Sequence, residues 1–213
     1  MRAQGEEVGP RGIAPDGHRA VTAAILAGGE SRRMGAPKEG VRLWDDRPMM
    51  EHVMSALSGV CSRLVVVGEC RGYRLPNEVT RVPDLHPGSG PLAGFEAVLA
   101  SGLDEAYLVA ACDQPFLTTE LLRRLLKADP ARPCFFLSEG GMVYPLPAYL
   151  PSSWLPAVSQ AVREERLSVR KLIAESQVCW APVDGQMEAC LGSVNSRADL
   201  AAWCGVDRRA LAR

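Results

Sequence analysis

The sequence carries almost no net charge, and this shortage limits the partners that the protein can have. Its 24 basic and 25 acidic residues give a formal net charge of -1, so no overall field attracts nucleic acid or an anionic membrane. No uninterrupted apolar segment approaches the length that spans a membrane. An anionic ligand must therefore be met by positive charge that is placed locally.

Histidines are few, and the cysteines follow no known pattern. The three histidines are scattered, and none of the seven cysteines belongs to a Cys-x-x-Cys pair. An odd number of cysteines at irregular spacing is unlike a disulfide framework or a zinc site, so we expect most of them to be small core residues. The start, Met1–Asp16, lacks the apolar core of a signal peptide, which predicts a soluble cytoplasmic protein.

The chain is long enough for one sizeable hydrophobic core, because 47% of its 213 residues are hydrophobic. We expect a disordered extension over residues 1–18, a single domain over 19–204 and a tail over 205–213. Apolar runs predict strands at 20–26, 64–68, 79–82, 106–112 and 177–183, and a hairpin at 134–137 and 142–146. Amphipathic patterns predict helices that begin near Pro48, Pro91 and Thr118, and further helices at 152–165, 168–175 and 196–203. This alternation predicts an α/β fold with a mostly parallel sheet and an antiparallel hairpin.

A loop that combines glycines with basic residues follows the first predicted strand. It reads Leu26-Ala-Gly-Gly-Glu-Ser-Arg-Arg-Met-Gly-Ala-Pro-Lys38. Its glycines can adopt backbone conformations closed to other residues and let N–H groups approach a ligand, while its basic side chains suit a polyphosphate. The residues concerned are Gly28, Gly29, Gly35, Arg32, Arg33 and Lys38. We expect a phosphate-binding loop in which only one of the two adjacent arginines points inward.

Two other loops follow predicted strands and carry acidic residues. Asp84 and a Pro-Gly-Ser-Gly-Pro segment come after one strand, and Asp113 comes directly after another. In open α/β sheets, ligands bind outside the carboxyl ends of the strands, so these loops and the glycine-rich loop are expected to converge. Basic groups with one carboxylate suit a nucleoside triphosphate with Mg²⁺, which commonly takes one or two protein carboxylates. Each aspartate can also be read as a turn-forming residue.

Two familiar nucleotide-binding signatures do not account for these loops. A Walker A loop is absent, because Ala-Pro separates Gly35 from Lys38 and Glu39 follows. The segment 88–93 matches a dinucleotide-binding pattern, but it does not directly follow a strand, and Pro91 lacks an N–H donor. No Ser-His triad is evident either. These observations favour phosphoryl or nucleotidyl transfer, in which positioning and charge stabilisation replace a protein nucleophile.

Several motifs resemble those of known transferases. The segment 26–38 resembles the opening signature of sugar-phosphate-type nucleotidyltransferases. Gly90-Pro-Leu-Ala-Gly94, Cys112-Asp-Gln-Pro-Phe116 and Val194-Asn-Ser-Arg-Ala-Asp-Leu200 narrow the resemblance to the molybdenum cofactor guanylyltransferases. The resemblance implies a Rossmann-like three-layer αβα sandwich of the nucleotide-diphospho-sugar transferase type. It also implies Mg²⁺-dependent transfer of GMP from GTP to the terminal phosphate of molybdopterin, with release of pyrophosphate.

The same resemblance implies roles for individual residues. Lys38 and Asp113 would carry catalysis, and Asp113 would also bind the metal. The nucleotide would be bound by Leu26, Ala27, Gly28, Gly29, Arg33, Lys38, Asp84 and Asp113, and the acceptor by Gly94, Arg170 and Asn195. Molybdoenzymes or cofactor-delivery proteins would be further partners, and neither nucleic acid nor a membrane is expected.

Other features bear on specificity. Related cytidylyltransferases tend to carry Leu-Ala-Ala-Gly where this chain has Leu-Ala-Gly-Gly, which favours guanine. The chain departs from the guanylyltransferase pattern at Gly68, where Asn often contacts guanine, and at Ser196, which follows Asn195 in place of Thr-Pro. The alternatives are therefore a related nucleotidyltransferase that uses CTP or a sugar-phosphate acceptor, and a non-catalytic nucleotide-binding or carrier relative.

Overall fold

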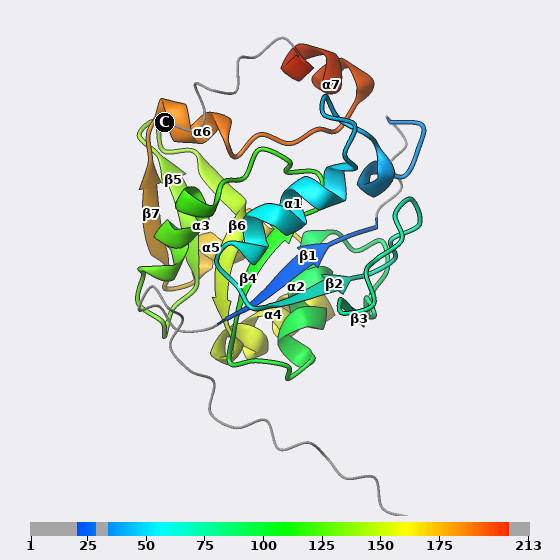
Figure 1. The fold of residues 1–213 in the computed structure, drawn as a ribbon. Coiled ribbons are helices and arrows are strands. Elements are labelled where there is room, and N and C mark those ends of the chain that lie inside the picture. Colours follow the sequence, from blue (N-terminus) through cyan, green and yellow to red (C-terminus); the bar gives the residue numbers. More distant parts are fainter. Residues whose placement is uncertain (1–20, 29–33, 205–213) are drawn as a thin grey trace, which may run out of the picture.

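The computed structural model describes residues 21–28 and 34–204, and these form one mixed sheet with helices on both faces (Figure 1). The strands lie in the order β3-β2-β1-β4-β6-β5-β7. Their bounds are Thr22–Leu26 (β1), Arg63–Val67 (β2), Thr80–Val82 (β3), Ala106–Ala111 (β4), Cys134–Ser138 (β5), Val143–Pro151 (β6) and Cys179–Val183 (β7). The predicted α/β class is confirmed.

All the strands run in one direction except β6, which is antiparallel to both of its neighbours. In the centre, Ala24 of β1 lies between Val65 of β2 and Val109 of β4, and these side chains are fully buried. Such apolar runs are typical of parallel strands that are covered on both faces. After β1, the chain adds β2 and then β3 on one side of it, and β4 pairs with the other side of β1. The sheet therefore has a topological switch point between β1 and β4.

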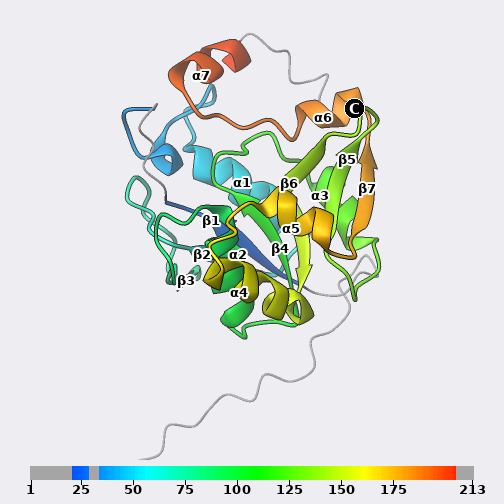
Figure 2. The ribbon, with the colours of Figure 1, turned by 180° about the vertical axis from the view of Figure 1, so that it is seen from behind.

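Helices cover both faces of the sheet and complete a three-layer sandwich (Figure 2). On one face lie α1 (Met49–Ser58) and α3 (Thr119–Leu126), and on the other lie α2 (Pro91–Ala100), α4 (Leu155–Arg163) and α5 (Val169–Glu175). Because side chains alternate along a strand, Ile25 packs under the first pair of helices and Ala24 under the second group. The three-layer architecture implied by the resemblance is confirmed.

The remaining elements are short. The 3₁₀ turns η1 (Lys38–Gly40) and η2 (Ser152–Trp154) precede α1 and α4, while α6 (Gly185–Ala189) and α7 (Arg197–Cys204) follow β7. The connection between α6 and α7 passes over the ends of the central strands (Figures 1 and 2). Within the described residues, no helix is long and apolar enough to cross a membrane.

Most predicted elements are present, with three differences. The helix predicted at 152–165 is a 3₁₀ turn followed by α4, because Pro156 has no N–H for the hydrogen bond that a regular helix starting at Ser152 would need. The second hairpin strand extends to Pro151, and the sequence did not predict η1 or α6. The predicted extension and tail, residues 1–18 and 205–213, lie outside the described residues.

Candidate functional site

A charged cluster lies at the carboxyl edge of the sheet, where β1 ends at Leu26, β2 at Val67, β3 at Val82 and β4 at Ala111. Lys38 Nζ donates to Asp113 Oδ2 at 2.9 Å and to Asn195 Oδ1 at 2.7 Å. The Lys38 and Asp113 side chains are 18% and 19% exposed, so both are largely shielded yet accessible to a ligand. The structure thus joins three predicted site residues from distant parts of the chain.

Lys38 is held by the short turn η1, whose next residue anchors it. The Glu39 side chain is buried, and its Oε1 accepts hydrogen bonds from the backbone N–H groups of Arg71 and Gly72 at 2.7 and 3.1 Å. Gly40 lies so close to this loop that a Cβ atom would stand 1.9 Å from the Gly72 carbonyl oxygen. A buried carboxylate that accepts two donors fixes the turn and hence the start of the Lys38 side chain. Sequence reasoning missed Glu39, because nothing in the local pattern indicates its burial.

Asp113 is fixed because the backbone on both sides of it is bound. Cys112 N–H donates to the Leu26 carbonyl at 3.0 Å, and the Asp113 carbonyl accepts from Val194 N–H at 2.8 Å. The buried Gln114 side chain accepts from Ala111 N–H at 3.0 Å and donates to the Leu146 carbonyl at 2.9 Å. These bonds connect the end of β4 to β1, to β6 and to the segment before α7. The Gln114 contribution was also not predicted.

Asn195 is positioned by the start of α7. Its N–H donates to Asp199 Oδ2 at 2.8 Å, while Asp199 N–H donates to Ser196 Oγ at 3.1 Å. This is the arrangement of a helix N-cap, in which a serine or threonine hydroxyl accepts from a backbone N–H in the first turn. Ser196 therefore caps α7, so the departure at this position keeps a hydroxyl where the helix needs one.

A small apolar cluster packs behind these residues. It consists of Met34, Leu43, Met49, Phe116 and Val194, with Val41, Trp44 and Leu200 partly buried against it. The Trp44 ring stacks on Phe116 with 5.6 Å between centroids, and it also contacts the His52 ring, with 4.8 Å between centroids. Because the cluster includes residues near Lys38, Asp113 and Asn195 in the chain, it holds the three segments together.

The backbone at the ends of β1 and β2 approaches closely at two glycines. Gly28 has a φ of +93°, and a Cβ there would lie 3.3 Å from the Glu69 carbonyl oxygen. Gly68 has a φ of +86°, and a Cβ there would lie 2.5 Å from the Ala27 carbonyl oxygen. Left-handed φ values and this spacing favour glycine at both positions. The departure at Gly68 thus has a physical reason, since any side chain would collide with the glycine-rich loop.

Of the other predicted nucleotide-binding residues, some lie near these glycines and some lie outside the residues that the structure describes. Asp84 follows β3, and its Oδ1 accepts from His86 N–H at 2.9 Å, which fixes the carboxylate in a local turn. Leu26 and Ala27, at the end of β1, are partly buried. Gly29 and Arg33, together with the second arginine of the loop, lie outside the described residues.

The predicted acceptor residues lie in different places. Gly94 is buried in α2, where a Cβ would stand 2.8 Å from Leu26 Cδ2, so glycine lets this helix approach the end of β1. Arg170, on α5, is exposed, and its charge acts on Tyr144 of β6. Their proposed contacts with an acceptor stay predictions.

Most of the described cysteines are buried in the core, as predicted. Cys61, Cys112 and Cys134 are buried, and burial raises the pKa of each thiol above its ordinary value of 9.0. Cys112 precedes Asp113, whose negative charge raises the pKa of this thiol further. These thiols remain protonated near neutral pH and are not nucleophiles.

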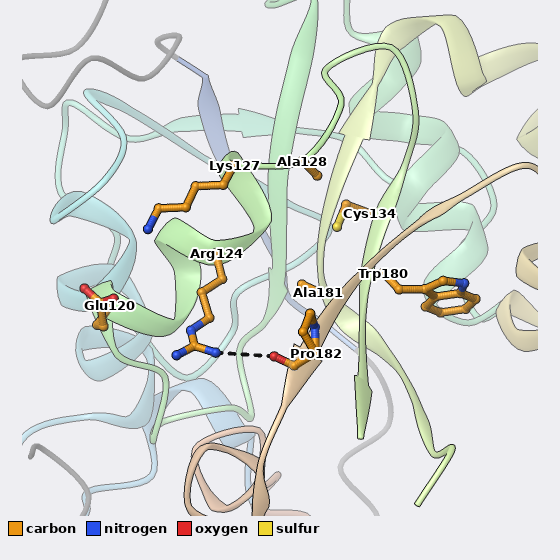
Figure 3. A pocket seen from close by; sticks show the side chains of 8 residues that line it. All are labelled: Glu120, Arg124, Lys127, Ala128, Cys134, Trp180, Ala181 and Pro182. Carbon is orange, nitrogen blue, oxygen red and sulfur yellow. Dashed lines mark hydrogen bonds between the residues drawn. The ribbon is translucent and has the colours of Figure 1, made fainter. Parts of the chain in front are cut away.

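A pocket of about 380 Å³ lies elsewhere, between α3 and the edge strand β7 (Figure 3). Arg124 donates to the Pro182 carbonyl across it at 3.4 Å, while the Trp180 ring points away from α3. Proline and a bound arginine protect an edge strand from pairing with another chain. The pocket contains none of the predicted site residues.

Comparisons with known proteins identify the family of the chain. A family model described as the MobA-like NTP transferase domain matches residues 23–205. The chain belongs to this family. It is 31% identical over 158 residues to the probable molybdenum cofactor guanylyltransferase of Flavobacterium johnsoniae, covering 73% of this chain and 81% of the relative. A relative of the same description from Pelotomaculum thermopropionicum is 33% identical over 150 residues, covering 70% and 72% of the two chains.

Solved structures support the family and its fold. Molybdopterin-guanine dinucleotide biosynthesis protein A from Archaeoglobus fulgidus superposes with a TM-score of 0.69 at 25% identity, covering 85% of this chain and 96% of that one. A 2-C-methyl-D-erythritol 4-phosphate cytidylyltransferase from Thermus thermophilus shares the fold with a TM-score of 0.63 at 20% identity, covering 86% and 96%. The predicted family and nucleotidyltransferase fold of this MobA-like chain are both confirmed.

Proposed function

We propose that the protein is a molybdenum cofactor guanylyltransferase, which transfers GMP from GTP to molybdopterin and releases pyrophosphate. The observation that carries this proposal is the Lys38–Asp113–Asn195 cluster at the switch point of the sheet. The name of the Flavobacterium johnsoniae relative supplies the substrates, and the Leu-Ala-Gly-Gly sequence supports guanine.

The charges of the cluster suit a triphosphate. Lys38 is a cation at the end of the glycine-rich loop, where phosphate oxygens would compete with Asp113 and Asn195 for its three N–H donors. Gly28 and Gly68 leave backbone close to the surface on the β1–β2 side of the cluster, where a base and ribose can lie. GTP would then extend from β1 and β2 toward Asp113.

The donor set also fits Mg²⁺. The Asp113 carboxylate and the Asn195 amide oxygen both point at the Lys38 ammonium, so two hard oxygens already converge on a positive charge. Mg²⁺ prefers oxygen ligands and is often bound by one or two carboxylates with substrate phosphates completing its shell. We assign Asp113 as its main protein ligand. When bound, the ion would neutralise negative charge on the transferring phosphate.

The reaction needs no protein nucleophile. A terminal phosphate oxygen of molybdopterin forms a bond to the α-phosphorus of GTP, and the bond from that phosphorus to the bridging oxygen of pyrophosphate breaks. Lys38 would stabilise the negative charge that builds up on the phosphates, and Asn195 would orient the Lys38 ammonium. We further propose, from the sequence, a cytoplasmic location and delivery of the product to molybdoenzymes or cofactor-delivery proteins.

A turnover assay tests the function. The protein, Mg²⁺ and molybdopterin are incubated with GTP, CTP, ATP or UTP, and pyrophosphate release is measured with and without a chelator. We expect release with GTP and loss with the chelator. Preference for CTP or a sugar phosphate would instead identify the related transferase. Binding of nucleotide without pyrophosphate release from any combination would identify the non-catalytic relative.

A further inference from the structure

A second polar cluster lies near the carboxyl edge, outside the Lys38 cluster. Tyr144 Oη donates to Glu188 Oε1 at 2.5 Å, and the charge of Arg170 acts on the same tyrosine. The three residues come from β6, α6 and α5, which are distant in sequence. Within the part of the chain that the structure describes, Arg170 makes no hydrogen bond or ion pair, and its side chain is exposed.

The sheet order places this cluster on the side of Asp113 that faces away from the glycine-rich loop. Gly28, Gly68 and Asp84 follow β1, β2 and β3. Tyr144 lies near the start of β6 and Glu188 follows β7, and both strands lie beyond β4 in the sheet. The segment from Glu188 to Val194 ends at the hydrogen bond to the Asp113 carbonyl, and it can span at most about 20 Å. A molecule held at Glu188 can therefore reach toward Asp113 from the side that the nucleotide leaves open.

Tyr144 keeps the Glu188 carboxylate in a defined orientation. Burial and the hydrogen bond and charge of Glu188 raise the pKa of Tyr144 to about 12, against the opposing effect of Arg170. The phenol therefore stays protonated near neutral pH and continues to donate to Oε1. A carboxylate has about four acceptor sites, so the remaining lone pairs of Glu188 can accept from a ligand.

We propose that Glu188, oriented by Tyr144, recognises the pterin ring of the acceptor; this inference rests on the proposed function. A 2-amino-4-oxo pterin presents its amino group and the adjacent ring N–H on one edge, as two donors that point the same way. A carboxylate accepts such a pair of donors in a bidentate arrangement. The positive charge of Arg170, which acts on Tyr144, suits the anionic groups of the same acceptor.

Guanine presents the same pair of donors, so the chemistry of Glu188 alone fits either ring. The placement favours the pterin, because the positions proposed for the guanine nucleotide follow β1, β2 and β3, on the other side of Asp113. Glu188 would then select the acceptor without affecting the choice of base.

Kinetics of Glu188→Gln and Tyr144→Phe test the assignment, with Glu120→Gln on the exposed surface of α3 as the matched control. We expect the KM for molybdopterin to rise at least about tenfold in Glu188→Gln and less in Tyr144→Phe, with the KM for GTP and the melting temperature unchanged. An unchanged KM for molybdopterin would overturn the proposal. A raised KM for GTP, with lost discrimination against ITP, which lacks the 2-amino group, would overturn it in favour of guanine. A lower melting temperature with both KM values altered would show that the Tyr144–Glu188 contact is structural only.

A binding titration keeps this test separate from that of the proposed function. Pterin-6-carboxylate is a stable fluorescent pterin, and its binding needs no turnover. We expect it to bind the wild-type protein and the Glu120→Gln control alike, and at least about tenfold more weakly to Glu188→Gln. Equal binding to all three proteins would overturn the pterin assignment. If the wild-type protein bound the probe in this way yet released no pyrophosphate, the proposed function would fail while the assignment of Glu188 stood.

Discussion

The ammonium group of Lys38 donates to the Asp113 carboxylate at 2.9 Å, although the two residues lie 75 positions apart in the chain. This ion pair joins the end of the glycine-rich loop to the end of β4, across the switch point of the sheet. A triphosphate would compete for the lysine, which frees a carboxylate oxygen to bind Mg²⁺. The pair therefore keeps each group next to the place where its ligand is expected to bind.

Lys38→Ala is expected to lower kcat/KM for GTP about 100- to 1,000-fold, because removal of one preorganised donor to a developing charge typically has an effect of this size. Steady-state pyrophosphate release measures it. Lys127→Ala, at the C-cap of α3, removes a lysine away from the site and is the control. Equal kcat/KM for wild-type protein and Lys38→Ala would contradict the role of the ammonium group.

Glu39→Ala is expected to lower the free energy of unfolding by about 1–3 kcal/mol, because the N–H groups of Arg71 and Gly72 would lose the buried carboxylate that accepts from them. It should also raise the KM for GTP, since η1 carries Lys38. Urea unfolding and initial rates measure the two effects. Glu39→Gln, which keeps a side-chain carbonyl oxygen, should show both effects more weakly. If Glu39→Ala were as stable as the wild type, the carboxylate would not anchor the turn.

Gly68→Asn would introduce the residue that often stands at this position in the guanylyltransferase pattern, yet we expect it to weaken GTP binding. A Cβ at Gly68 would lie 2.5 Å from the Ala27 carbonyl oxygen, so the loop would have to move. The GTP-induced shift in melting temperature measures the effect. Gly102→Asn is the matched control, because Gly102 also has a positive φ, of +63°, but a Cβ there would meet no atom within 4 Å. A larger GTP-induced shift in melting temperature in Gly68→Asn than in the wild type would contradict this account.

Stability in acid is expected to depend on Asp45, which binds Arg47 and His52 beside the small apolar cluster. Partial burial raises the pKa of Asp45, but the hydrogen bonds from Arg47 and the charge of His52 outweigh it and lower the pKa from 3.8 to about 2. A lowered pKa adds stability above pH 4 that is lost as the pH falls toward 2. When unfolding is measured over this pH range, the free energy of unfolding should fall less in Asp45→Asn than in the wild type. Identical curves for both proteins would refute the contribution of Asp45.

The sequence predicted which strand ends carry the candidate site residues. Asp113 follows the apolar strand β4, and Asp84 follows β3 after one proline. Parallel strands bring such ends to one edge, so the expected convergence with the glycine-rich loop followed from local patterns. The signature of the loop and the segments at Gly94, Asp113 and Asn195 also carried the family resemblance.

The supporting contacts could not be predicted, because they join residues without a shared local pattern. Glu39 has the sequence context of a surface residue, and only the fold brings the Arg71 and Gly72 N–H groups to its carboxylate. Tyr144 and Glu188 lie 44 positions apart and meet only because α6 returns to the sheet beside β6. The 3₁₀ turn at Lys38 is too short to show a periodicity.

Pyrophosphate release by Asp113→Asn across a Mg²⁺ titration tests the central claim most directly. This variant keeps the size of the side chain but loses the charge that would hold the ion. We expect release from GTP and molybdopterin to fall at least about 1,000-fold at every Mg²⁺ concentration, while Asp129→Asn on the surface behaves like the wild type. Wild-type release by Asp113→Asn at equal Mg²⁺ would contradict the account.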